Sequence, residues 1–124
     1  MVYVSFYFRR LKINNTLIEF ECDDFVIINK PHGVLSHPTN TSTELTISDF
    51  LKEKYKLSGV GDHGREGIVH RLDRVTTGLM VCPIKDESYI LFKRMFHDRD
   101  IKKYYKALVE GNLPSKTGEI ELPL

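Results

Sequence analysis

The chain has 124 residues, of which 41% are hydrophobic and 28% are charged, and its formal net charge is +1. This composition is ordinary for a soluble globular chain, so we expect one small domain or a piece of a larger one. No run approaches the roughly 20 apolar residues of a membrane-spanning helix, and the start lacks the pattern of a secretory signal. Two widely spaced cysteines predict reduced thiols in an intracellular protein.

The first part of the chain predicts strands. Residues 2–8 alternate Val and Phe with Tyr and Ser, and this period of two is typical of a strand. A second short strand is expected over residues 17–20, and a buried strand over residues 25–28 runs into Asn-Lys-Pro-His-Gly at 29–33. Proline fixes φ and glycine permits a positive φ, so this turn holds Lys30 rigidly at a strand end. Taken alone, the pentapeptide is simply a turn.

A helix and a loop are expected next. Thr46 and Asp49 form a capping box, and the helix that they start places apolar residues on one face. The helix is expected to end near Gly59. Residues 59–67 contain four glycines, which predicts a mobile loop. The histidines of the chain match no zinc spacing, so no metal is expected.

The most informative stretch follows at residues 67–82. Asp73 lies between Arg71 and Arg74 on a short polar loop, with Ile68 and Val69 before it. The continuous apolar run after it, residues 79–82, predicts a strand buried on both faces. A carboxylate on a loop between buried strands is held on a rigid frame, which is where functional groups often lie. An ion pair of Asp73 with either arginine explains the same pattern without catalysis.

The last third predicts one more helix and more strand. A helix is expected from about Asp86 to His97, and its aromatic stripe is more typical of core than of a base-stacking surface. In residues 101–109, strand periodicity places Lys103 and Tyr105 on one face and Tyr104 on the other. Residues 120–124 read as a further strand. Basic side chains gather here and fit either phosphate contact or a solvated helix face: Lys93, Arg94, Arg99, Lys102, Lys103 and Lys106.

Three segments together resemble the RluA-type RNA pseudouridine synthases. Residues 70–73 read His-Arg-Leu-Asp and residues 76–79 read Thr-Thr-Gly-Leu, as in the signature of that family. Residues 29–33, with His-Pro at 37–38, are similar to its Asn-Lys-Pro-x-Gly turn, and residues 103–111 to its Lys-x-Tyr-x-Ala-x-Val-x-Gly strand. The resemblance implies an α+β fold with a mixed, mainly antiparallel sheet and a few flanking helices.

The resemblance also implies an activity, the isomerisation of uridines in ribosomal or transfer RNA to pseudouridine without cofactor or metal. Asp73 would be the catalytic aspartate. Its ionised carboxylate would either attack covalently or abstract a ribose proton, and the sequence leaves both open. Tyr105 would pack against the uracil, and Arg71 would fill the space of the extruded base or hold a phosphate. The RNA-contacting set implied by the resemblance is Arg71, Tyr105, Lys30, Lys103, His70 and Arg74, with Lys30 and Lys103 contacting phosphate or orienting the site.

The chain lacks segments that members of the family carry. It has no later Gly-Arg-Thr-His-Gln-Ile-Arg-like segment, whose arginine pairs with the catalytic aspartate in the family, and no S4 RNA-binding domain. We therefore expect residues 1–124 to be a partial catalytic domain that begins with strands over residues 1–22, lacks its C-terminal half and is inactive alone. The full-length protein is expected to be a monomer, cytoplasmic or, in a eukaryote, organellar, with no membrane partner.

Two alternatives stay open from the sequence. One is a noncatalytic RNA-binding remnant of the same family. The other is an unrelated α+β domain whose loop carries a structural ion pair. Tritium release from uracil-5-labelled RNA separates the enzyme from both, and salt-dependent RNA binding separates the two alternatives from each other.

Overall fold

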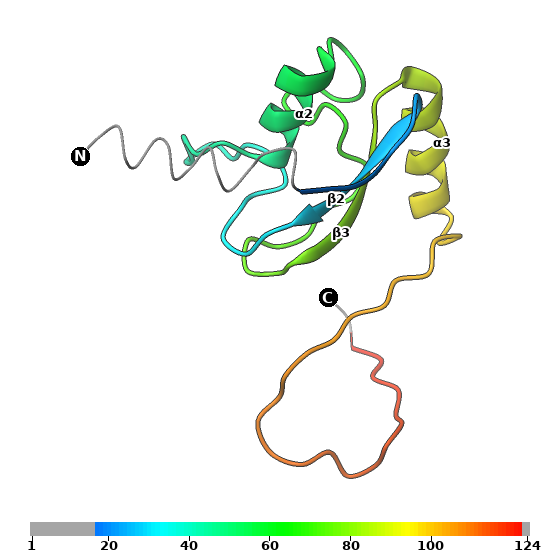
Figure 1. Cartoon of the computed structure of the whole chain (residues 1–124). Helices are drawn as coiled ribbons and strands as arrows, with labels where there is room; N and C mark the ends of the chain where they lie inside the picture. The colour runs from blue at the N-terminus through cyan, green and yellow to red at the C-terminus, as the bar shows by residue number, and fades with distance from the viewer. Residues whose placement is uncertain (1–16, 123–124) are drawn as a thin grey trace, which may run out of the picture.

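Five helices and strands make up the computed structural model, which describes residues 17–122. The strand expected over residues 2–8 lies outside them. In chain order the elements are β1 (Ile18–Glu21), β2 (Phe25–Lys30), α2 (Ile47–Tyr55), β3 (Gly78–Pro83) and α3 (Asp86–His97) (Figure 1). The α+β class is confirmed, and every strand pair of the described sheet is antiparallel. Between residues 17 and 122, no helix is long and apolar enough to cross a membrane.

The sheet has the order β1-β2-β3, so β2 is the central strand. Directly opposed residues on β2 and β3 share one face of the sheet, and the register pairs Val26 with Cys82 and Ile28 with Met80. All four side chains are fully buried, and they form one core cluster with residues of α2 such as Leu51. One face of the sheet is therefore packed against the hydrophobic core.

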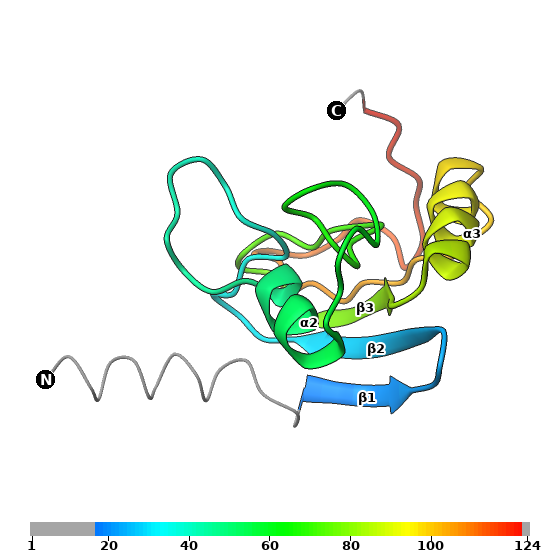
Figure 2. The same cartoon turned by 90° about the horizontal axis from the view of Figure 1, so that it is seen from above.

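The other face of the sheet is only partly covered. Leu79 is 62% exposed and Val81 is half-buried, so the expectation of a strand buried on both faces is wrong for β3. A sheet with one covered face alternates buried and exposed residues in this way. Figures 1 and 2 show α3 beside the end of the sheet where β3 leaves it, and the Phe92 ring of α3 contacts the Phe25 ring edge-on, with centroids 5.2 Å apart.

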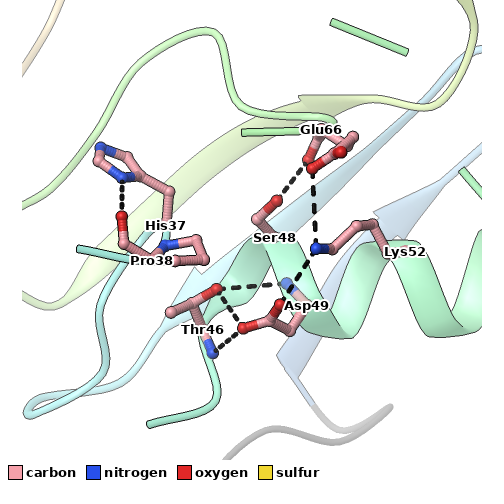
Figure 3. Close-up of polar contacts among 7 residues, drawn as sticks. All are labelled: His37, Pro38, Thr46, Ser48, Asp49, Lys52 and Glu66. Carbon is pink, nitrogen blue, oxygen red and sulfur yellow. Dashed lines mark hydrogen bonds and ion pairs between the residues drawn. The ribbon is translucent and has the colours of Figure 1, made fainter. Parts of the chain in front are cut away.

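Helix α2 begins with the predicted capping box (Figure 3). The Thr46 hydroxyl accepts from the Asp49 N–H at 3.2 Å, and the Asp49 carboxylate accepts from the Thr46 N–H at 3.0 Å. Two backbone donors at the helix start are thereby satisfied. The helix ends at Tyr55, and its C-cap residue Lys56 has a left-handed φ of 53°.

The glycine-rich loop after α2 is packed rather than loose. The Ser48 hydroxyl of α2 donates to Glu66 O at 3.0 Å, and the ammonium of Lys52 lies 3.8 Å from the Glu66 carboxylate (Figure 3). Inside the loop, the Gly67 N–H donates to Val60 O at 3.0 Å. The expected mobile loop is thus attached to α2 at the end that leads into the Asp73 motif.

Gly67 and Gly64 provide a matched test of this packing. Both have a positive φ, 74° and 77°, but a Cβ on Gly67 would lie 2.9 Å from Leu51 Cδ1 and 3.2 Å from Pro83 O, whereas one on Gly64 meets nothing within 4 Å. We expect Gly64→Ala to destabilise by the left-handed strain alone, about 1–2 kcal/mol. Gly67→Ala should lose a further ~1–3 kcal/mol from overpacking. Urea unfolding measures both, and equal losses would show that the loop does not pack as described.

The C-terminal segment does not form the expected strands. Residues 102–122 are exposed and have no regular secondary structure. In Figure 1 they leave the sheet and helices as a wide loop. The physical reason is that a strand needs the backbone of a neighbour, and no strand within residues 17–122 pairs with this segment. The prediction for residues 101–109 is therefore wrong in this structure, and so is that for residues 120–122, while residues 123–124 lie outside the described part.

Candidate active site around Asp73

Asp73 lies on a tight turn between the core and β3. The Thr76 N–H donates to Asp73 O at 3.0 Å, which closes the turn two residues before β3 begins. Upstream, Ile68 is buried but belongs to no strand. The loop is thus anchored by a strand at one end and by core packing at the other, not by two strands as expected.

The carboxylate of Asp73 is exposed and unpaired. Within residues 17–122, no hydrogen bond or ion pair reaches it. Arg74 pairs instead with Glu44, with Nη1 and Oε2 2.7 Å apart, and Arg71 is exposed without a side-chain partner among the described residues. A structural ion pair between Asp73 and a neighbouring arginine is therefore not what the loop contains, and the carboxylate is free to act on a ligand.

Lys30 lies beneath this turn and is fully buried. Its ammonium donates to the carbonyl oxygens of Val34 at 2.7 Å, Pro31 at 3.1 Å and Arg74 at 3.2 Å. A lysine ammonium has three donors, so all of them are used inside the protein. The expected contact of Lys30 with RNA phosphate is thus wrong for this arrangement, and the alternative role, orienting the site, fits it.

Lys30 also brings a positive charge close to Asp73. Burial lowers the pKa of the Lys30 ammonium, and the negative charge of Asp73 acts in the opposite direction. The Lys30 ammonium donates to Arg74 O at 3.2 Å, so it lies next to the residue that follows Asp73, where opposite charges attract. The buried ammonium is therefore the cation on the protein side of the Asp73 turn.

The sequence reasoning missed Ser36, which is 3% exposed. Its hydroxyl donates to Leu72 O at 2.9 Å and accepts from the Leu72 N–H at 3.2 Å. The signal for it was a lone hydroxyl in the otherwise apolar stretch between Gly33 and His37-Pro38, since a buried hydroxyl needs a partner. Ser36, which is not part of the Asn-Lys-Pro-x-Gly or His-Pro motif, thus connects the segment after that turn to the Asp73 loop.

His70 serves the scaffold. Its Nε2 accepts from the Val81 N–H at 3.1 Å, and its ring stacks on Phe96 of α3 with centroids 4.3 Å apart. Burial, together with the positive charge of Lys103, lowers the pKa of His70 to about 4. The ring is neutral near pH 7 and cannot act as a cation toward phosphate, so the expected RNA contact is corrected to a link between the loop, β3 and α3.

The lowered pKa of His70 predicts a pH-dependent stability. In the unfolded chain His70 titrates near its ordinary value of about 6.5, so below that pH the unfolded state binds the extra proton and folding is disfavoured. The free energy of unfolding should therefore be highest above pH ~6.5 and fall by up to roughly 3 kcal/mol as the pH drops toward ~4. Urea unfolding of wild type and His70→Gln across this range measures it. The same slope in both proteins would contradict the assignment.

Lys103 and Tyr105 make no hydrogen bond or ion pair with Asp73 among the described residues. The Lys103 ammonium lies 5.2 Å from the centroid of the Phe96 ring, next to His70. Tyr105 is 64% exposed and Tyr104 87%, and among the described residues neither side chain has a hydrogen bond, ion pair or ring contact with the Asp73 loop. Lys30 is thus hydrogen-bonded to the Asp73 turn and the two tyrosines are not, so the role of Tyr105 stays a prediction.

Comparison with known proteins identifies relatives of the whole described fold. The family model described as RNA pseudouridylate synthase matches residues 24–124. A dual-specificity RNA pseudouridine synthase RluA of Pasteurella multocida is 40% identical over 103 residues, which are 82% of this chain and 43% of the relative. The ribosomal large subunit pseudouridine synthase D of Zymomonas mobilis is 37% identical over 109 residues, 86% of this chain and 34% of the relative.

A solved structure agrees with these matches. The human RNA pseudouridylate synthase domain containing 4 superposes with a TM-score of 0.54 at 25% sequence identity, covering 81% of this chain and 36% of that chain. The chain spans between about a third and two fifths of the length of the relatives named here. Because the family match extends over residues 24–124, the chain belongs to the RNA pseudouridylate synthase family.

Proposed function

We propose that this chain carries the aspartate-bearing part of an enzyme that isomerises uridine in RNA to pseudouridine. The observation that carries the proposal is the Asp73 carboxylate, which is exposed and unpaired on a turn whose two neighbouring residues are fixed to the protein. The relatives are named as RNA or ribosomal large subunit pseudouridine synthases. Since the chain spans only part of their length, the activity and the RNA substrate are proposed rather than carried over.

The chemistry needs no group from outside the protein and the RNA. The bond between the ribose carbon and the uracil nitrogen breaks, the base rotates, and the same ribose carbon forms a bond to uracil C5. The C5 proton leaves to solvent, and the released ring nitrogen takes up one proton from solvent, so atoms and charge balance. The ionised Asp73 either attacks covalently or removes a ribose proton, and both roles need a carboxylate that no other side chain occupies. A paired uridine must first leave its stack, at a cost of a few kcal/mol. Arg71, which is exposed two residues from Asp73, would contact the vacated space.

The test is tritium release from RNA labelled at uracil C5. The chain is assayed alone and mixed with the separately expressed C-terminal part of the Pasteurella multocida relative, on ribosomal and transfer RNA transcripts. We expect release in the mixture and none from the chain alone, because the family's later arginine is supplied only by the added part. Release from neither would contradict the proposed activity. Salt-dependent RNA binding without release would favour the noncatalytic alternative.

Tyr105→Ala and Tyr104→Ala form a matched pair in the same assay. The family motif assigns the uracil contact to Tyr105, and stacking of a base on an aromatic ring contributes about 1–3 kcal/mol. We expect Tyr105→Ala to lower turnover by roughly 5- to 100-fold and Tyr104→Ala to leave it nearly unchanged. Both side chains are exposed in this chain, so neither change should alter its stability. Equal losses would show that the motif has been assigned to the wrong tyrosine.

The RNA partner is supported by exposed basic side chains near Asp73 and along the C-terminal segment, such as Arg71, Lys102 and Lys106. The predicted contact of Arg74 with RNA is compatible with its exposed pair with Glu44. The monomeric state and the cytoplasmic or organellar location stay predictions from the resemblance, to be measured by sedimentation and by imaging of a tagged protein.

A further inference from the structure

The residues on both sides of Asp73 are hydrogen-bonded to one short segment, residues 33–36. The residue before it, Leu72, shares two hydrogen bonds with the Ser36 hydroxyl, at 2.9 Å to its carbonyl oxygen and 3.2 Å from its N–H. The residue after it, Arg74, has its carbonyl oxygen bonded by the Gly33 N–H at 2.8 Å. Both attachments come from residues 33–36. The backbone on either side of Asp73 is therefore fixed to a single segment, while its carboxylate is left free.

The Ser36 attachment is built to be rigid. Ser36 is 3% exposed and Leu72 is 8% exposed, so water does not compete for these bonds, and hydrogen bonds in such surroundings are stronger than at the surface. The hydroxyl uses both its donor and an acceptor lone pair on the same residue. Its other near neighbour is Met80 Sδ, at 3.6 Å on β3. One side chain thus fixes both backbone polar groups of the residue next to Asp73.

We propose that Ser36 is a positioning residue for Asp73. It acts through the backbone at Leu72 and contacts no substrate atom, so its effect is on where the carboxylate lies and how widely it moves. The inference rests on the proposed function for its consequence in turnover, since a misplacement of about 1 Å in a reacting group can lower a rate by about 10²-fold. The positioning itself is measurable without any turnover.

Ser48 offers a matched control for Ser36→Ala. It is also fully buried, and its hydroxyl donates to a loop carbonyl, Glu66 O, at 3.0 Å (Figure 3). Both alanine variants therefore lose a buried serine–carbonyl hydrogen bond, but only Ser36→Ala loses one beside Asp73. If the backbone of residues 72–74 becomes more mobile in Ser36→Ala and not in Ser48→Ala, the cause is the lost positioning of Asp73 and not a general loss of stability.

The first measurement is nuclear magnetic resonance of the chain itself. In Ser36→Ala we expect the backbone order parameters of residues 72–74 to fall from ~0.85 toward ~0.6, and the Leu72 amide to exchange at least about tenfold faster. In Ser48→Ala both quantities should match wild type. Unchanged values in Ser36→Ala, or the same change in both variants, would overturn the proposal.

The second measurement is turnover in the mixture used for tritium release. Ser36→Ala should lower kcat by roughly 10- to 100-fold and keep KM within about twofold, and Ser48→Ala should leave both unchanged. A change confined to KM, or equal losses in the two variants, would overturn the positioning role. If wild type releases no tritium, the proposed function fails, and the resonance data alone decide whether Ser36 positions Asp73.

Discussion

Replacing Asp73 by asparagine should reduce tritium release to background while leaving the fold intact. The substitution is nearly isosteric but removes the charge and basicity on which either role depends, so the expected loss is at least about 10²–10⁴-fold. The structure makes the outcome sharp, because the carboxylate makes no hydrogen bond or ion pair with the described residues that the change would break. The free energy of unfolding should therefore fall only slightly, by less than about 1 kcal/mol, through the lost attraction between the Asp73 charge and the Lys30 ammonium.

Asp100→Asn is the control for this experiment. Asp100 is exposed after the end of α3, so its substitution removes one surface charge of the same sign away from the Asp73 turn. Turnover should stay at the wild-type level. Retained turnover in Asp73→Asn would end the catalytic assignment. A large loss of stability in Asp73→Asn would show instead that the carboxylate has a structural role.

The elements predicted correctly were those whose signals are local. The capping box at Thr46 and Asp49 satisfies two donors within four residues, and the apolar run at residues 25–28 forms the central strand β2. The alternation at residues 101–109 failed for the opposite reason. It describes which side chains would share a face, but a strand exists only where another backbone lies beside it, and none is present for that segment within the described residues.

The site was also predicted only in part, because some of its features depend on local sequence and others on packing. The sequence order of the motif put Asp73 on a loop and Lys30 at a strand end, and both placements are correct. Residue type then suggested that a lysine and a histidine in such a motif meet RNA. Burial makes this interpretation wrong for both residues. The Lys30 ammonium is enclosed by carbonyl oxygens, and the buried His70 ring is neutral. Burial depends on the packing of distant segments, which no local pattern contains.

Lys30→Met should be among the most destabilising single changes in the chain. Methionine fills a similar length, but it has no donor for the carbonyl oxygens of Val34 and Pro31, which would be left buried without the bonds they make at 2.7 and 3.1 Å. Each buried polar group left unpaired costs about 1–3 kcal/mol. We expect a total loss of roughly 2–5 kcal/mol, which for a domain of this size lowers Tm by about 10 °C or more.

Lys85→Met is the matched control, because Lys85 is an exposed lysine whose ammonium lies 3.0 Å from the Asp24 carboxylate. Solvent screens an exposed pair of this kind and it contributes little to stability, so Tm should change little. Lys30→Arg tests the geometry further, since a planar guanidinium cannot present three donors to carbonyl oxygens gathered around one nitrogen. It should be destabilised although the charge is kept. Wild-type stability in Lys30→Met would show that apolar packing, and not these hydrogen bonds, holds the turn against the Asp73 loop.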